Sequence, residues 1–322
     1  MEQRPRRNRR STNIRDMIAE TKVTVNQLIY PLFIVDGSNV KISIESMPNC
    51  YRWSLDLLLI EIESCIKIGI NSFVIFPAVE DHLKDKVATY SYSENNFYLK
   101  AIREIKSKFP EITLMSDVAM DPYSSDGHDG LVRNGEIIND ETLPILAKMA
   151  VAQADAGIDI IGPSDMMDGR IGFIRNSLDN NGFIDTSLMS YTAKYASAFY
   201  GPFRDALDSA PKSGDKKTYQ MDPRNSKEAL REAELDVIEG ADILMVKPAM
   251  CYLDVISQLN QSFDLPISAY NVSGEYAMIH AASQKGWLDY EKSMIETLTS
   301  IKRAGASIIL TYFAKDFASL KN

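Results

Sequence analysis

The sequence predicts an α/β fold, a (β/α)8 TIM barrel with an extended N-terminal arm. Short apolar runs rich in β-branched and aromatic residues recur eight times along the 322 residues. These runs are continuous rather than alternating, which is typical of strands buried on both faces of a parallel sheet. Helical patterns lie between most of them, and eight strands with intervening helices favour a closed barrel.

In chain order, the predicted strands cover residues 28–35, 72–78, 113–120, 158–165, 187–194, 243–249, 267–273 and 307–313. Helical patterns between them include residues 54–69, 96–109, 141–157, 226–240 and 290–305. Several of these patterns end in a glycine, a residue favoured just after a helix C-terminus. An open, doubly wound sheet is the alternative, but no strand is followed by a glycine-rich phosphate-binding motif.

The segment before the first predicted strand is rich in arginine, with Arg4, Arg6, Arg7, Arg9 and Arg10. We interpret residues 1–22 as an arm outside the barrel and residues 23–322 as the TIM-barrel catalytic domain. A disordered basic tail is the alternative for the first residues.

Charge and composition argue against several classes of function. The net charge of −9 does not favour nucleic-acid binding by the chain as a whole. The three cysteines, Cys50, Cys65 and Cys251, are far apart, which argues against a disulfide scaffold or a cysteine-only zinc site. No signal peptide or membrane-spanning run is recognised, so we expect a soluble, cytoplasmic protein without nucleic-acid or membrane partners.

Two lysines suggest a chemistry, because function in a barrel lies where strands end. Lys194 and Lys247 close the fifth and sixth predicted strands. Adjacent strands are about 4.8 Å apart, so both side chains could project into one pocket. Each cation would disfavour protonation of the other, and a neutral lysine can attack a ketone to form an imine. The alternative is a pair of surface lysines neutralised by nearby carboxylates.

Other polar segments also follow strand ends. Residues 213–218, a basic segment with a glycine, together with Arg204 predict a mobile cover over a carboxylated substrate; a solvated loop is equally compatible with the pattern. The aspartates after the third strand could bind a hard cation through oxygen, or could simply form turns. His128 alone is weak support for a metal site, and we read His82 and His280 as structural.

Long motifs then indicate a family. The stretches PSDMMDGRIG (163–172), AKYASAFYGPFRD (193–205), GDKKTYQM (214–221), MVKP (245–248) and VSGEYA (272–277) resemble porphobilinogen synthase, also called 5-aminolevulinate dehydratase. The resemblance covers nearly the whole chain, with the motifs in the family's order. It implies condensation of two 5-aminolevulinate molecules to porphobilinogen through lysine Schiff bases, with loss of two waters, in tetrapyrrole (haem) biosynthesis.

The resemblance also implies roles for individual residues. Lys247 resembles the lysine that holds the substrate forming the propionate side of the product, and Lys194 the second Schiff-base lysine. Asp117 resembles an aspartate beside the reacting amine. The other matched residues bind the two substrate carboxylates: Arg204 and Lys216 for one, Ser273 and Tyr312 for the other.

One departure concerns the metal. Where zinc-dependent members carry three cysteines after the third strand, this chain has Ala119, Asp121 and Asp129. It therefore resembles the aspartate-rich, magnesium-responsive branch, in which Asp121 and Asp129 are tentative ligands of an active-site cation and zinc is not expected. Glu232 resembles the ligand of an allosteric Mg2+. The family also implies a homo-octamer in which the arm contacts a neighbour, and no organic cofactor.

Two other functions remain alternatives. A class I aldolase is also a Schiff-base barrel, but it needs one such lysine and usually a phosphate cradle. A catalytically inactive scaffold would have no need for Lys194, Lys247, Ser273 and Tyr312 together.

Overall fold

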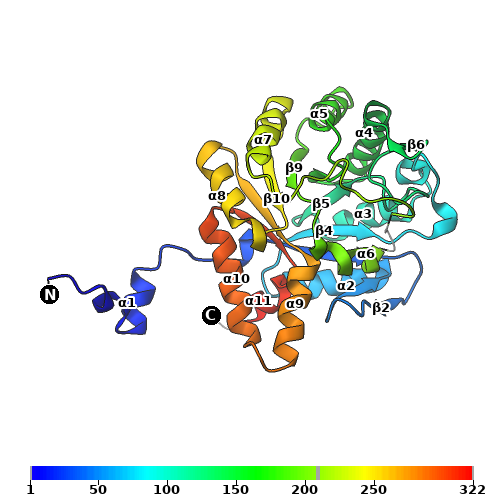
Figure 1. The fold of residues 1–322 in the computed structure, drawn as a ribbon. Helices are drawn as coiled ribbons and strands as arrows, with labels where there is room; N and C mark the ends of the chain where they lie inside the picture. Colours follow the sequence, from blue (N-terminus) through cyan, green and yellow to red (C-terminus); the bar gives the residue numbers. More distant parts are fainter. Residues whose placement is uncertain (1, 208–210, 321–322) are drawn as a thin grey trace.

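Eight parallel strands close into a barrel, as the sequence predicts (Figure 1). The structure is a computed structural model and describes residues 2–207 and 211–320; residue 1 of the predicted arm and residues 321–322 of the predicted barrel domain lie outside them. The barrel strands are β1 (Leu28–Ile34), β4 (Ser72–Pro77), β5 (Thr113–Val118), β8 (Ile160–Pro163), β9 (Ser187–Lys194), β10 (Ile243–Lys247), β11 (Ile267–Asn271) and β12 (Ile308–Thr311).

Pairing between the first and last strands closes the barrel. Leu28 lies opposite Ile309, and Ile29 lies opposite Leu310, in a parallel arrangement. Every residue of β1 is buried, and all but the first residue of β10 are buried. A strand covered on both faces cannot alternate apolar and polar residues, which explains the continuous apolar runs of the sequence.

Helices surround the barrel (Figure 1). The helical patterns recognised in the sequence correspond to α2 (Leu55–Ile66), α3 (Phe97–Lys108), α4 (Asn139–Asp155), α7 (Lys227–Glu239) and α10 (Tyr290–Ala304). The structure adds helices that we did not predict: α5 (Arg170–Asn180), α6 (Gly201–Leu207), α8 (Leu253–Ser262), α9 (Ser273–Gln284) and α11 (Ala314–Ser319). Helix α9 starts at Ser273, where the predicted strand had its last residue.

Local signals define several helix ends. The Asn96 side chain accepts a hydrogen bond from the Tyr98 amide at the start of α3, and Asp289 caps α10 in the same way. Helix α7 ends at Gly240, whose φ of 101° lies in the left-handed region that glycine adopts without strain.

Short strands and 3-10 helices lie in the loops between the barrel strands and the helices. These are β2 (Lys41–Ser43), β3 (Tyr51–Trp53), β6 (Val132–Arg133), β7 (Glu136–Ile137), η2 (Val25–Gln27), η3 (Asp81–Leu83), η4 (Thr89–Tyr92), η5 (Ala198–Tyr200) and η6 (Met250–Tyr252). Strands β6 and β7 form an antiparallel hairpin. Within the described residues, no helix is long and apolar enough to cross a membrane.

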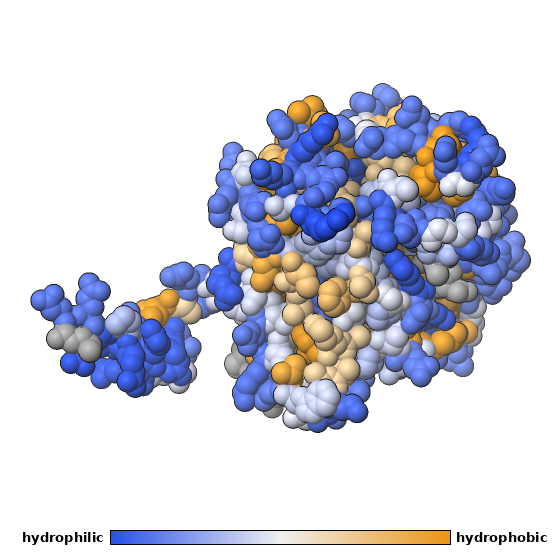
Figure 2. Space-filling view, viewed as in Figure 1, coloured by the Kyte–Doolittle hydropathy of each residue, from blue (hydrophilic) through white to orange (hydrophobic). Residues whose placement is uncertain are grey.

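The N-terminal segment stands away from the barrel (Figure 1). It contains η1 (Pro5–Arg9) and α1 (Thr12–Met17), and neither buries a residue against the rest of the chain. Its surface is largely hydrophilic (Figure 2). An isolated helix of this length is marginal in water, because helix nucleation is unfavourable. Packing against the barrel therefore adds little to the stability of η1 and α1.

Candidate active site

The two lysines end neighbouring strands of the barrel. Lys194 is the last residue of β9 and Lys247 the last of β10, and the parallel pairing places them directly opposite each other. Both side chains are buried. The register shifts between Leu244 and Val246, so an irregularity in the pairing precedes the two lysines. The arrangement expected from the spacing of the strands is present.

Lys247 lies in an aromatic enclosure. Its Nζ is 4.7–5.4 Å from the ring centres of Tyr191, Tyr200, Phe203 and Tyr270. Burial, followed by repulsion from the Lys194 cation, lowers the pKa of Lys247 to about 7. The ring faces attract the protonated form, so both protonation states are accessible near neutral pH.

Lys194 has a different environment. Its Nζ donates to Asp129 Oδ2 at 2.9 Å and to the carbonyl oxygen of Ser164. These contacts hold the Lys194 side chain between a carboxylate and a backbone carbonyl oxygen. The surroundings of the two lysines therefore differ in polarity. Lys194 contacts a carboxylate and a carbonyl oxygen, whereas Lys247 is enclosed by aromatic rings.

Asp117 is a half-buried carboxyl group that interacts with both lysines. It lies on β5, and its Oδ2 accepts a hydrogen bond from Ser164 Oγ at 3.0 Å. Its Oδ1 is buried without a hydrogen-bond partner among the described residues. Burial raises the pKa of Asp117 to about 6, although Lys247 and Lys194 both act to lower it. A carboxyl group with such a pKa can accept and return a proton near neutral pH.

Lys216, in the segment predicted as a cover, reaches the aspartates that follow β5. Lys216 is buried, and its Nζ forms ion pairs with Asp121, at 3.1 Å, and with Asp129. Burial disfavours the charge, but the two carboxylates raise the pKa of Lys216 above its usual value. Asp129 receives both Lys194 and Lys216; burial would raise its pKa, yet the two cations lower it to about 2.

The remaining predicted carboxylate binders lie on three further elements. Arg204 is half-buried on α6. Ser273 begins α9, and its Oγ accepts a hydrogen bond from the Phe203 amide at 3.0 Å. Tyr312 follows β12, and its hydroxyl lies 3.0 Å from that of Tyr270. Phe203 and Tyr270 both enclose Lys247, so Ser273 and Tyr312 are grouped with that lysine.

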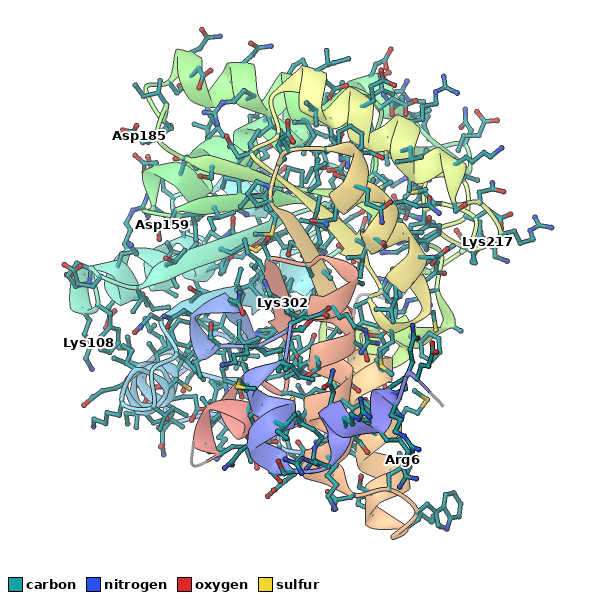
Figure 3. The ribbon with its side chains drawn as sticks, turned by 90° about the vertical axis from the view of Figure 1, so that its left-hand side faces the viewer. Arg6, Lys108, Asp159, Asp185, Lys217 and Lys302 are labelled. Atoms are coloured by element: carbon teal, nitrogen blue, oxygen red, sulfur yellow. The ribbon has the colours of Figure 1, made fainter. Side chains whose placement is uncertain are left out.

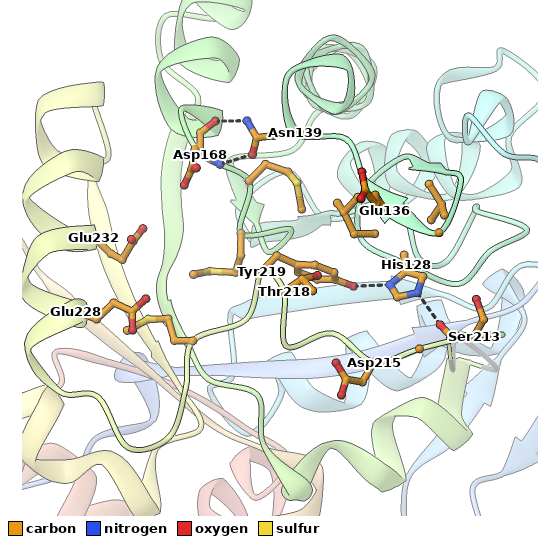
Figure 4. Close-up of a pocket in the computed structure, with 17 residues that line it drawn as sticks. His128, Glu136, Asn139, Asp168, Ser213, Asp215, Thr218, Tyr219, Glu228 and Glu232 are labelled. Carbon is orange, nitrogen blue, oxygen red and sulfur yellow. Dashed lines mark hydrogen bonds between the residues drawn. The ribbon is translucent and has the colours of Figure 1, made fainter.

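Glu232 lies apart from the lysines, on α7. It is half-buried and faces a cavity of about 900 Å3 that is also lined by the acidic residues Glu136, Asp168, Asp215 and Glu228 (Figure 4). Burial raises the pKa of Glu232; Arg170 opposes the shift, and Asp168 and Glu228 add to it. The cavity thus gathers negative charge around an open space.

Neither of the two predicted metal sites, at Asp121 and Asp129 or at Glu232, has enough described side chains in place to bind a metal ion directly. Within residues 2–207 and 211–320, no group of three or more His, Cys, Asp or Glu side chains is arranged to hold an ion. At Asp121 and Asp129, the ammonium groups of Lys216 and Lys194 already pair with the two carboxylates, so these residues do not fit a resident metal as well. At Glu232, the surrounding carboxylates and the open cavity fit an ion that keeps its water shell.

The sequence analysis missed several residues around the site. The aromatic enclosure of Lys247 was not recognised, because its rings come from four separate elements, β9, η5, α6 and β11, none of which carries Lys247 itself. A buried network below Lys194 was also missed: Arg170 Nη1 lies 3.5 Å from Asp236 Oδ1, and Arg170 Nε lies 3.9 Å from Asp165 Oδ2. A charged residue close to the end of a strand, such as Asp165 two residues after β8, is the signal that could have identified it.

Comparison with known proteins gives a consistent result. The family model described as delta-aminolevulinic acid dehydratase matches residues 2–320. A delta-aminolevulinic acid dehydratase of Chlamydia pneumoniae is 53% identical over 98% of this chain and 95% of the relative. A chloroplastic delta-aminolevulinic acid dehydratase of Oryza sativa subsp. japonica is 55% identical over 98% of this chain and 75% of its own length.

The fold of the chain also matches that of a solved structure. The crystal structure of delta-aminolevulinic acid dehydratase (porphobilinogen synthase) from Toxoplasma gondii, in complex with the reaction product porphobilinogen, superimposes with a TM-score of 0.97 at 50% identity. The match covers 99% of this chain and 91% of that chain.

Proposed function

This chain belongs to the delta-aminolevulinic acid dehydratase family, and from that premise we propose which residues carry out its reaction. The enzyme forms porphobilinogen in tetrapyrrole biosynthesis. The reaction joins two molecules of 5-aminolevulinate, an amino-ketone with a carboxylate, and releases two waters. The site must therefore activate ketones, hold two carboxylates and move protons.

The contrast between the two lysines supports an order of events. Lys247 has a pKa of about 7, so a large share of its amine is neutral at physiological pH. Its free electron pair attacks the ketone carbon of the first substrate, and loss of water leaves an imine. Lys194 donates to Asp129 and to the Ser164 carbonyl oxygen, so its amine reaches the second substrate only after these contacts are given up.

Asp117 is the proposed proton carrier between these steps. Its pKa of about 6 exceeds that of Asp129, about 2, so it is the better proton acceptor of the two. Its position among Lys194, Lys247 and Ser164 suits transfer to and from the reacting amines.

Two pairs of side chains are proposed to hold the substrate carboxylates. Ser273 and Tyr312, grouped with Lys247, supply hydroxyl donors to the first substrate. Arg204 and Lys216 supply cations to the second. Lys216 must leave Asp121 and Asp129 to reach a substrate, and this exchange of one carboxylate partner for another keeps its charge compensated.

The metal requirement is proposed to be met by magnesium. Members of this family are metal-dependent. We place a hydrated Mg2+ beside Glu232, with Asp168 and Glu228 nearby, because magnesium retains its waters and prefers oxygen donors. Such an ion would neutralise the acidic cavity and support the closed state of the site. Asp121 and Asp129 would hold a cation only after Lys216 has left them, and no step of the proposed reaction depends on that ion.

Assembly and location complete the proposal. The segment of residues 1–22 buries no residue in η1 or α1, which supports its role as an arm that contacts other copies in a homo-octamer. Residues 23–322 would then form the catalytic domain. We place the enzyme in the magnesium-responsive branch and in the cytoplasm, without nucleic-acid or membrane partners.

Covalent trapping tests the central assignment. The protein is incubated with 5-aminolevulinate, reduced with borohydride and digested, and the adducts are located by mass spectrometry. We expect an adduct on Lys247 at limiting substrate and additional labelling of Lys194 at saturating substrate. Lys247→Ala should abolish pyrrole formation. An absence of any adduct on Lys247 would refute the mechanism.

A further inference from the structure

We propose that His128 is a positioning residue that holds the lid, defined here as residues 213–219, in the orientation that the second substrate requires. The inference rests on the proposed function, because that function assigns Lys216 of the lid to a substrate carboxylate. It is carried by a chain of hydrogen bonds that joins both ends of the lid to one buried imidazole (Figure 4).

His128 contacts the lid at two points. Its Nε2 lies 2.9 Å from the carbonyl oxygen of Ser213, at the start of the lid, and its Nδ1 lies 3.1 Å from the hydroxyl of Tyr219, at the end. The Tyr219 ring also meets the imidazole nearly edge to face, with 6.1 Å between ring centres. One side chain thus fixes the separation of the two ends of the loop.

The chemistry of these groups sets the direction of each bond. A carbonyl oxygen only accepts, so Nε2 must carry the hydrogen and donate to Ser213. In the neutral imidazole, Nδ1 then accepts from the Tyr219 hydroxyl. That hydroxyl in turn accepts from the Asp129 amide at 3.3 Å. Each polar group in this series of hydrogen bonds therefore has a partner.

This series of hydrogen bonds extends from His128 to the lysines of the site. Asp129 follows His128 in the sequence, and its carboxylate pairs with both Lys194 and Lys216. Lys216 lies between the two anchored ends of the lid. By holding Ser213 and Tyr219, His128 limits the positions that Lys216 can reach when it exchanges Asp121 and Asp129 for a substrate carboxylate.

The surroundings leave the lid with little other support on its outer side. Ser213, Gly214, Asp215, Thr218 and Tyr219 line the cavity of about 900 Å3, so open space rather than packed side chains lies beside them (Figure 4). A loop next to a cavity lacks the apolar contacts that restrict motion elsewhere. The hydrogen bonds of His128 therefore have a large share in fixing its position.

The test compares His128→Ala, His128→Gln and Tyr219→Phe with the unmodified full-length protein. We expect His128→Ala and Tyr219→Phe to raise the KM for pyrrole formation at least tenfold, with a smaller change in kcat. Trapping of 5-aminolevulinate on Lys247 at limiting substrate should stay within twofold, because the first substrate does not use the lid. His128→Gln keeps a donor and an acceptor and should recover part of the KM.

A second readout follows the lid without activity. Limited trypsin digestion should cleave after Lys216 or Lys217 several times faster in His128→Ala and Tyr219→Phe. Tyr219→Phe removes one oxygen atom, so it keeps the test decisive if His128→Ala does not fold. An unchanged KM together with unchanged cleavage would overturn the proposal, as would equal losses of trapping and turnover. Absence of Lys247 trapping in the unmodified protein would instead refute the proposed function.

Discussion

At the scale of single residues, two lysines of the same type differ because of what surrounds them. Lys247 faces aromatic rings, which exclude water and leave its charge poorly solvated. Lys194 faces Asp129 and a carbonyl oxygen, to which its Nζ donates hydrogen bonds. The reactivity of the site therefore depends on placement rather than on residue type.

The first residue-scale prediction concerns pH. Burial and Lys194 lower the pKa of Lys247 to about 7, and only the deprotonated amine attacks a ketone. The initial rate of imine formation with levulinate, which has the ketone and carboxylate but no amine, should rise with pH and reach half its maximum near pH 7. Continued increase beyond pH 9, as for an exposed lysine with a pKa of about 10.4, would contradict the lowered pKa.

The second residue-scale prediction concerns the carboxylate binders. Lys216→Ala and Arg204→Ala should mainly weaken capture of the second substrate, because a charge-assisted hydrogen bond contributes about 1.5–3 kcal/mol. Steady-state kinetics over a wide substrate range measure the effect. Lys217→Ala is the matched control: its side chain is 75% exposed and pairs with Asp215 at the surface (Figure 3). Equal effects at Lys216 and Lys217 would remove the assigned role.

At the scale of elements, the site is assembled where strands end and helices begin. Helix α9 starts at Ser273 beside η5, and this contact is close because Gly274 has no side chain. A Cβ atom added at Gly274 would lie 2.5 Å from the carbonyl oxygen of Phe199 and 2.8 Å from its Cα. The approach of these two elements sets where Ser273 meets the Phe203 amide.

Gly274→Ala should therefore separate α9 from η5 and displace Ser273. Overpacking of this kind costs about 1–3 kcal/mol of folding stability, and the loss of position should also raise the KM. Thermal unfolding and steady-state kinetics measure both effects. Gly201→Ala, on α6, is the control, because a Cβ atom there meets nothing within 4 Å. A stable, fully active Gly274→Ala variant would show that the close contact is dispensable.

At the scale of the whole molecule, charge is unevenly distributed. The chain carries a net charge of −9, whereas its N-terminal arm is rich in arginine and is exposed in η1 and α1. Acidic side chains also line the cavity beside Glu232. Opposite charge on separate parts of one chain favours association between copies.

We predict that magnesium stimulates pyrrole formation and favours the larger oligomer, without added zinc. Glu232→Ala should lose the stimulation but keep basal activity, because Glu232 lies on α7 and not at a strand end. Glu234→Ala, an exposed position on the same helix, should respond as the unmodified protein does. Activity and oligomer size are followed together during a magnesium titration. Equal stimulation of both variants would exclude Glu232, and an absolute zinc requirement would contradict the metal assignment.

The sequence by itself determined the barrel and the candidate residues of its centre. Continuous apolar runs and helix-ending glycines are local patterns, so they identified all eight barrel strands without knowledge of contacts. Helix α9 was not recognised, and its first residue, Ser273, was assigned to the preceding strand. Lys194 and Lys247 could be predicted as neighbours because consecutive parallel strands place their last residues side by side.

The tertiary structure alone decided how these residues are paired and protonated. Lys216 meets Asp121 across 95 residues of sequence, and His128 meets Ser213 across 85. No local pattern encodes such contacts, since they depend on how the loops above the barrel fold over one another. The lowered pKa of Lys247 likewise follows from rings on separate elements. Burial and charge act through space, so the ionisation of Lys247 is a property of the folded molecule.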